Sequence, residues 1–242
     1  MSIAVLLETS DFLIINKPAG LRTHGDGKSD VPTVADWILK ERPEIVGVGE
    51  NMEIDGHLIE RPGIVHRLDE ETSGALIITK TQAAFSYLKQ QFKDRKVEKE
   101  YHAFVRGHFK ETGGIVDEPI GRSSGDFRRW QAGRGVRGET REAVTRWEAV
   151  SQFEDETGER FSFVHLWPKT GRTHQLRVHM KYLQRPLVAD GLYGGKPALG
   201  FSRVALHARS ISFTVPDGEH ISVQAPYPED FASAVEHYCK GA

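Results

Sequence analysis

The 242-residue sequence has a single cysteine, Cys239, so it has no second thiol with which to form an internal disulfide or a cysteine-rich zinc module. It also has no long apolar run, because the stretch that opens the chain stops at Glu8, too early for a signal peptide or a membrane span. Nor is positive charge in excess, since 32 Lys and Arg face 34 Asp and Glu. These absences favour a cytoplasmic protein in which any polyanion must meet a local basic surface.

Nucleotide-binding motifs are missing as well: there is no Walker loop, and no Gly-x-Gly-x-x-Gly opens a helix. What is present is an ordinary globular composition, with 38% hydrophobic and 27% charged residues. We find no internal repeat, no low-complexity tract and no linker. The sequence therefore predicts one folded domain over residues 1–242.

Hydrophobic patterning predicts an α+β fold with a mixed, mainly antiparallel sheet and flanking helices. Helices are expected over residues 33–42, 81–95 and 173–183, and again after Pro228. A long loop is expected from Pro43 to Gly63, and Asp217-Gly218 is expected to turn a final hairpin. Strands are expected over residues 3–7, 12–15, 63–68, 75–79, 101–105, 144–150, 161–166, 210–215 and 221–224.

The stretch from His66 to Gly74 packs an arginine and three carboxylates into a bend after an apolar strand. An exposed acidic turn explains Glu70 and Glu71, whose side chains can point to water. Asp69 lies just past the expected strand end, where loops carry functional side chains. A catalytic Asp69 is therefore one of two interpretations of this bend.

A second stretch, from Thr170 to Met180, is a glycine turn that runs into a helix. Arg177 adjoins the apolar face of this helix, where an arginine can pair with a carboxylate and keep it ionised. Asp69 is the candidate partner. His174 and His179 do not have the i, i+4 spacing of a zinc helix, so we expect no metal there.

Seven arginines lie between Arg122 and Arg146, with Trp130 and Trp147 among them. Solvated loop charges are one explanation. A flexible basic finger that grips phosphates and stacks an aromatic on a base is the other, and residues alone leave both open. In the second case we expect residues 122–146 to be mobile in the free protein and ordered by RNA.

Together these stretches resemble the RluA branch of the RNA pseudouridine synthases. The matching motifs are His-Arg-Leu-Asp at 66–69, Thr-Ser-Gly at 72–74, Lys-Glu-Tyr at 99–101 and Gly-Arg-Thr-His-Gln-Leu-Arg-Val-His at 171–179. Residues 16–20 and 186–193 look like further family segments. The resemblance implies the family fold, with a central catalytic cleft, and isomerisation of uridine to pseudouridine in ribosomal or transfer RNA.

The resemblance also implies roles for individual residues. Asp69 matches the essential aspartate, which either attacks C1′ of the target ribose or removes a ribose proton. Tyr101 matches the tyrosine that packs against the base, and Arg177 the arginine that pairs with the aspartate. Arg67 matches an arginine that takes the space of the flipped-out base. Substrate contacts are further expected from Leu68, Leu176, Arg172 and His174.

The implied reaction needs no cofactor and no metal, and the expected partner is structured RNA rather than a membrane or a second protein chain, so a monomer is expected. Sixty-eight residues precede Asp69, and we expect no room there for the N-terminal RNA-binding domain of many relatives. Two alternatives remain. A glycoside hydrolase would also act at C1′ but needs paired carboxylates, and a catalytically silent RNA-binding or chaperone protein could keep the same fold.

Overall fold

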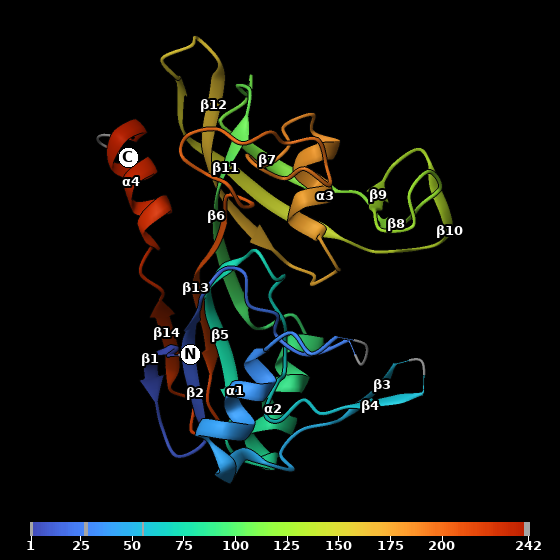
Figure 1. The fold of residues 1–242 in the computed structure, drawn as a ribbon, viewed down its shortest axis with the longest axis vertical. Coiled ribbons are helices and arrows are strands. Elements are labelled where there is room, and N and C mark those ends of the chain that lie inside the picture. The colour runs from blue at the N-terminus through green and yellow to red at the C-terminus, as the bar shows by residue number, and fades with distance from the viewer. Residues whose placement is uncertain (1, 27–28, 55, 240–242) are drawn as a thin grey trace. The chain divides into compact units, whose positions relative to one another are not determined.

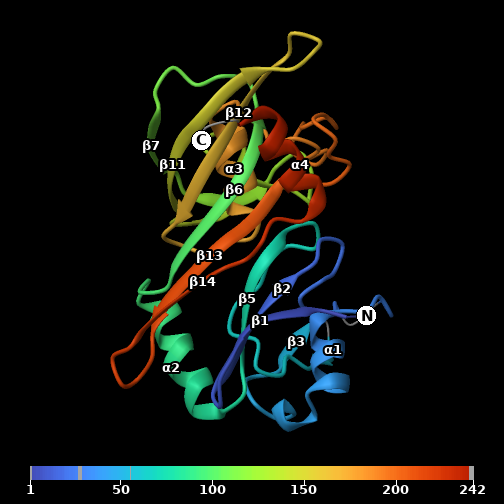
Figure 2. The same ribbon diagram turned by 90° about the vertical axis from the view of Figure 1, so that its left-hand side faces the viewer.

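The computed structural model describes residues 2–26, 29–54 and 56–239. It divides into two compact units, one formed by Met1–Glu98 with Ala208–Pro226 and the other by Lys99–His207 with Tyr227–Ala242. Helices and mainly antiparallel strands occur in both units (Figures 1 and 2), which confirms the expected α+β class. Within the described ranges, no helix is long and apolar enough to cross a membrane. The single domain and the central cleft stay predictions.

The sheet of the first unit combines expected strands from the N-terminal part of the chain with expected strands from residues 206–224. Its order is β1 (Ala4–Glu8), β2 (Phe12–Lys17), β5 (Ser73–Thr79) and β13 (Leu206–Thr214), with β14 (His220–Gln224) paired to β13 (Figure 2). The Asp217-Gly218 turn joins the last two strands, as expected, and Gly218 has a φ of 92°.

Both faces of β2 and β5 are buried, which explains why these two strands are continuous apolar runs. Ile14 and Ile77 pair across β2 and β5 and pack with Leu88 of α2 (Gln82–Lys93). The alternate residues of the same strands are fully buried as well: Leu13, Ile15, Leu76 and Ile78.

The two helices of this unit begin where side-chain oxygens can cap them. Thr33 and Asp36 form a reciprocal capping box at the start of α1 (Val34–Glu41). Thr81 accepts the N–H of Ala84 at the start of α2. Both predicted helices are confirmed to within two residues at each end.

Two predictions for residues 43–68 are wrong. The expected loop contains the short helix η1 (Pro43–Ile45) and a hairpin of β3 (Met52–Ile54) and β4 (His57–Ile59). Each strand of that hairpin has only three residues, which is too short for a period of two to be recognised.

The expected strand over residues 63–68 is reduced to one isolated bridge, between Ile64 and Ile78. Gly63 adopts a φ of 66°, which ends extended pairing on that side. His66 then replaces the backbone as a partner, because its Nε2 accepts the N–H of Ile77 at 3.0 Å. A side chain thus takes the hydrogen bond that a neighbouring strand would have made.

The sheet of the second unit is antiparallel, as expected. Its order is β6 (Glu98–Arg106), β12 (Arg160–Pro168), β11 (Val144–Glu154) and β7 (Gly113–Asp117). The helix α3 (Gln175–Tyr182) packs Leu176 against one face through Leu166. The helix α4 (Glu229–Tyr238) packs Phe231 against the other face, where Cys239 is buried.

The arginine-rich segment forms a small sheet of its own, with the order β10 (Val136–Arg141), β8 (Ile120–Ser123) and β9 (Trp130–Ala132). The apolar side chains of Ile120 and Ala132 are buried with Val178 of α3 and with Tyr193. This sheet is therefore fixed to the helix that carries Arg177. The sequence located the segment but did not predict its strands.

Candidate active site

Asp69 lies on an irregular bend of the first unit, shortly before β5. Thr23 fixes the residue before it, because the Thr23 hydroxyl donates to the carbonyl of Leu68 (2.9 Å) and accepts the Leu68 N–H (3.2 Å). Lys17 fixes the residue after it, since its Nζ donates to the carbonyl of Glu70 at 3.1 Å. Thr23 is 2% and Lys17 0% exposed, so the bend is held from inside the protein. Such support preorganises a functional side chain.

Positive side chains surround this bend. Arg67 is exposed and its NH1 lies 3.3 Å from Nε2 of His24. Burial lowers the pKa of His24, and the charges of Arg67 and Arg61 lower it further. Burial and the charge of Arg67 also lower the pKa of Arg61, whose buried Nε has no hydrogen-bond partner among the described residues. The cluster is therefore suited to attract an anion.

The carboxylate next to Asp69 has a structural partner. Glu70 accepts a hydrogen bond from Nε of Arg22 at 2.9 Å, and the same arginine contacts Asp26 at 3.1 Å. Both ion pairs are partly exposed, so they contribute little to stability. This agrees with a surface role for Glu70.

In the second unit, Arg177 is held in a buried ion pair that the sequence did not reveal. Its Nε and NH2 donate to the two carboxylate oxygens of Asp190, each at 2.8 Å. Asp190 is 0% exposed, and the Arg177 guanidinium lies 5.1 Å from the ring centre of Tyr193. The parallel hydrogen bonds fix the plane of the guanidinium. Pairing of Arg177 with Asp69 stays a prediction, because the two residues belong to different units.

The loop before α3 is closed by hydrogen bonds within the unit. His174 adopts a φ of 56°, and its Nδ1 lies 2.9 Å from the hydroxyl of Tyr193. That hydroxyl accepts the N–H of Trp130, which links the loop to the arginine-rich sheet. Arg172 donates from Nε to the carbonyl of Glu142. Arg172 and His174 thus have structural partners, and their contact with substrate stays a prediction.

Tyr101 of β6 and Leu176 of α3 lie in the same apolar region of the second unit. Both belong to the apolar cluster that α3 forms with the sheet, and Tyr101 is partly exposed at its edge. An aromatic ring beside an aliphatic side chain offers a flat, apolar surface of the kind that stacks on a nucleobase.

Lys99 lies on the same face of β6, two residues before Tyr101, and its Nζ is 3.5 Å from the carbonyl of Thr170. Burial lowers the pKa of Lys99 to about 8. Folding thus disfavours the protonated, charged form of Lys99 relative to its neutral form.

Replacing Lys99 by Met is expected to raise the free energy of unfolding at pH 7 by up to about 3 kcal/mol, because a buried charge is removed. Between pH 8 and 10.5 the unfolded chain binds a proton that folded Lys99 has lost, so wild-type stability rises with pH. The advantage of Lys99→Met should therefore disappear over that range. Urea denaturation at pH 7, 8.5 and 10 measures the free energy of unfolding of both proteins. A difference between them that stays the same at all three pH values would contradict the lowered pKa of Lys99.

The histidines considered as metal ligands in the sequence have other partners. His179 is fully buried, with Nδ1 2.9 Å from the hydroxyl of Thr145 and Nε2 3.1 Å from the carbonyl of Glu118. Among the described residues, the side chains placed closely enough to hold an ion are instead Glu100, His102 and His165.

Comparison with known proteins gives a consistent result. The family described as RNA pseudouridylate synthase matches residues 11–182. The uncharacterized RNA pseudouridine synthase YlyB of Bacillus subtilis is 34% identical over 99% of this chain and 74% of its own length. The ribosomal large subunit pseudouridine synthase D of Vibrio parahaemolyticus is 34% identical over 96% of this chain and 69% of its own length.

A solved structure agrees with these relatives. Human RNA Pseudouridylate Synthase Domain Containing 1 superimposes with a TM-score of 0.73 at 28% identity, over 94% of this chain and 84% of that protein. The similarity thus extends through both units rather than resting on the motifs alone.

Proposed function

The chain belongs to the RNA pseudouridylate synthase family, and we propose that it isomerises specific uridines of ribosomal RNA to pseudouridine through Asp69. The observation that carries this proposal is the bend on which Thr23 and Lys17 hold the neighbours of Asp69. A carboxylate on a preorganised bend, next to a positive surface, is suited to act on a ribose whose phosphates that surface attracts.

The reaction exchanges one glycosidic bond for another. The N1–C1′ bond of uridine breaks, the uracil turns, and a C5–C1′ bond forms while C5 loses its proton to solvent and N1 takes up a proton. Atoms and electrons balance within the nucleotide and water, so the enzyme's task is positioning and proton transfer. Asp69 either attacks C1′ as a nucleophile or removes a ribose proton so that a glycal forms.

C1′ and C5 are inaccessible in a stacked helix, so the target nucleotide must flip out. We assign to Arg67 the occupation of the vacated space, since it is exposed and two residues from Asp69. Tyr101 and Leu176 would receive the base on their apolar surface. Arg177, oriented by Asp190, would pair with the Asp69 carboxylate and keep it ionised.

Ribosomal RNA is favoured over transfer RNA by the names of two relatives. Ribosomal large subunit pseudouridine synthases D of Vibrio parahaemolyticus and Xanthomonas campestris are 34% and 36% identical to this chain. The chain spans 69% and 66% of their lengths.

The arginine-rich sheet provides the local basic surface that the net charge does not. Asp126 binds Arg128 and Arg129, which partly supports the interpretation as solvated charges. By contrast, the Arg122 guanidinium lies 4.2 Å from the ring centre of Trp130, and Phe127 is 84% exposed. A cation over the partly exposed ring of Trp130 and near the exposed Phe127 is suited to phosphates and unstacked bases, so we assign this sheet to RNA binding.

Replacing Arg137 and Arg141 together by Gln is expected to weaken RNA binding at all sequences, because each exposed guanidinium on β10 neutralises phosphate. The slope of log affinity against log salt should become smaller by about 2. Filter binding between about 50 and 300 mM KCl measures the slope. Arg160→Gln is the matched control, since Arg160 is exposed on β12 and pairs with Glu154. Equal slopes for all three proteins would exclude β10 from RNA binding.

The function itself is tested with ribosomal RNA labelled with tritium at C5 of uridine, taken from cells that lack this protein. Release of tritium into water by the wild type is the expected result. RNA binding without release would instead favour a catalytically silent RNA-binding protein.

A further inference from the structure

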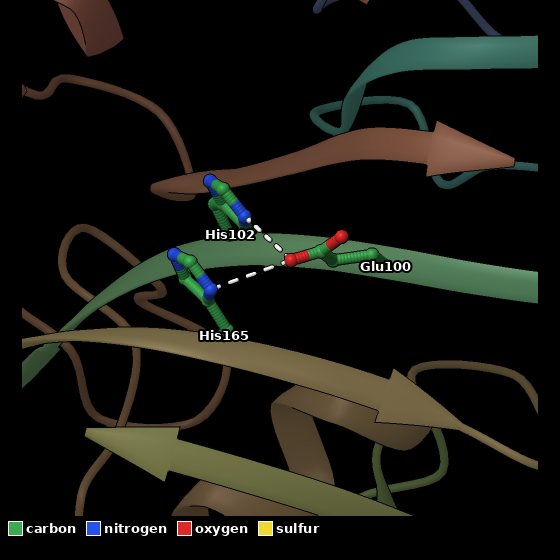
Figure 3. Close-up of side chains that lie close together, drawn as sticks. All are labelled: Glu100, His102 and His165. Atoms are coloured by element: carbon green, nitrogen blue, oxygen red, sulfur yellow. Dashed lines mark hydrogen bonds and ion pairs between the residues drawn. The ribbon is translucent and has the colours of Figure 1, made fainter. Parts of the chain in front are cut away.

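Three potential metal ligands meet on one face of the second unit: Glu100, His102 and His165 (Figure 3). Glu100 and His102 are two residues apart on β6 and so point to the same side of the sheet. His165 on β12 is directly opposite His102 in the antiparallel register. Side chains at i, i+2 and the opposing cross-strand position form a triangle above the sheet.

The atoms of this triangle are spaced as ligands of one ion are. Oε1 of Glu100 lies 3.1 Å from Nε2 of His102 and 3.3 Å from Nδ1 of His165. Ligands at about 2.0–2.2 Å from a tetrahedral zinc ion are roughly 3.3–3.6 Å apart. All three ligand atoms lie within 4.8 Å of one another. The three ligand atoms are therefore close enough together to reach a common ion.

One of the ligands is already oriented by a second contact. Nδ1 of His102 forms a short hydrogen bond with the hydroxyl of Tyr227, and the His102 side chain is 7% exposed. Metal-binding histidines characteristically use their second nitrogen in this way, which fixes the ring and its tautomer. Glu100 and His165 are 26% and 23% exposed, so an ion and a completing water have access.

We propose that Glu100, His102 and His165 bind a divalent transition-metal ion, of which zinc is the representative. Two imidazoles and one carboxylate favour zinc and its first-row neighbours over magnesium or calcium, which prefer oxygen ligands alone. The sequence did not indicate this site, because Glu100 and His165 are brought together only by the pairing of β6 with β12.

Ion binding requires one ring to turn. The rings of His102 and His165 stack with their centres 3.7 Å apart and their planes 6° apart. Nitrogen lone pairs lie in the ring plane, so two parallel rings do not point at one ion. His165 is the ring that turns, since it is the more exposed and Tyr227 holds His102. The ion then replaces the hydrogen bond between Glu100 and His102 and the ion pair between Glu100 and His165.

The bound ion would join β6 to β12 on the side opposite Tyr101. Residues 100 and 102 face one side of β6 and Tyr101 the other, because strand side chains alternate. The ion would thus stiffen the strand behind the proposed base-binding surface without touching the base. Its effect is independent of the reaction that Asp69 performs.

The test is calorimetric titration of zinc chloride into the EDTA-treated full chain, comparing the wild type with His165→Ala and Glu100→Gln. One equivalent is expected to bind the wild type, and each variant should bind at least about 100-fold more weakly. His220→Ala is the matched control, because His220 is exposed on β14. Far-ultraviolet circular dichroism confirms that each variant is folded.

Cobalt(II) provides a second measurement on the same proteins. Visible absorption bands of a four-coordinate cobalt ion are expected for the wild type and His220→Ala and not for His165→Ala. Excess zinc should also raise the thermal midpoint of the wild type by about 5 °C. Equal zinc affinity in the wild type, His165→Ala and Glu100→Gln would overturn the proposal, as would absence of micromolar binding to the wild type.

Discussion

Replacing Asp69 by Asn is expected to lower tritium release from C5-labelled ribosomal RNA by at least about 10³-fold, because the amide can neither attack C1′ nor accept a ribose proton. Asn has the shape of Asp, and the backbone groups of the neighbouring Leu68 and Glu70 are held by Thr23 and Lys17. The variant should therefore fold normally and bind RNA with wild-type affinity. The loss would then belong to the chemical step.

Glu71→Gln is the matched control, because it removes a neighbouring carboxylate of the same bend that has no assigned part in the reaction. It should release tritium at close to the wild-type rate. If Asp69→Asn kept the wild-type rate, Asp69 would not be the essential carboxylate. If neither the wild type nor the variant released tritium while both bound RNA, the chain would be a binding protein.

Much of the fold could be predicted because the informative patterns are local. A stretch of about ten residues is enough to recognise an apolar strand or a helix cap. The structure confirms the strands β2 and β5 and the caps Thr33 and Thr81. The strand expected at residues 63–68 failed because His66 binds the N–H of Ile77, eleven positions away. Nothing in the neighbourhood of His66 distinguishes such a ring from an ordinary strand residue.

The supports of the candidate site were missed for a related reason. Lys17 is fully buried and donates to the carbonyls of Pro18, Leu21 and Glu70, whereas lysine is rarely buried without a charged partner. The resemblance marks residues 16–20 as a family segment but implies no role for Lys17. The role of Lys17 cannot be predicted from the sequence, because its three acceptor carbonyls come together only once the bend has folded.

Asp190 illustrates the limit most clearly. The sequence predicts that Arg177 lies beside an apolar face and pairs with a carboxylate. The structure contains a partner of that type, Asp190. Its identity depends on the turn after α3, which brings a residue thirteen positions further along the chain back to the helix. Residue type was predictable from physical chemistry, while the pairing needed the three-dimensional structure.

Replacing Asp190 by Asn is expected to destabilise the protein by roughly 3–5 kcal/mol, because a buried guanidinium loses the charge that compensates it. The Asn amide would also place a donor against an N–H of Arg177, where Asp190 accepts two hydrogen bonds. Urea denaturation at pH 7 measures the loss. Asp126→Asn removes the partner of the exposed Arg128 and is the matched control, with an unchanged denaturation midpoint expected.

Activity and stability can be separated at this ion pair by removing both charges. Replacing Arg177 by Met and Asp190 by Leu together should recover most of the lost stability, since a buried ion pair can be exchanged for apolar side chains without a net cost. Tritium release should nevertheless stay at the level of Asp69→Asn, because the fixed cation is gone. A stable double variant with wild-type activity would show that Arg177 and Asp190 serve the fold alone and would exclude them from the positioning of Asp69.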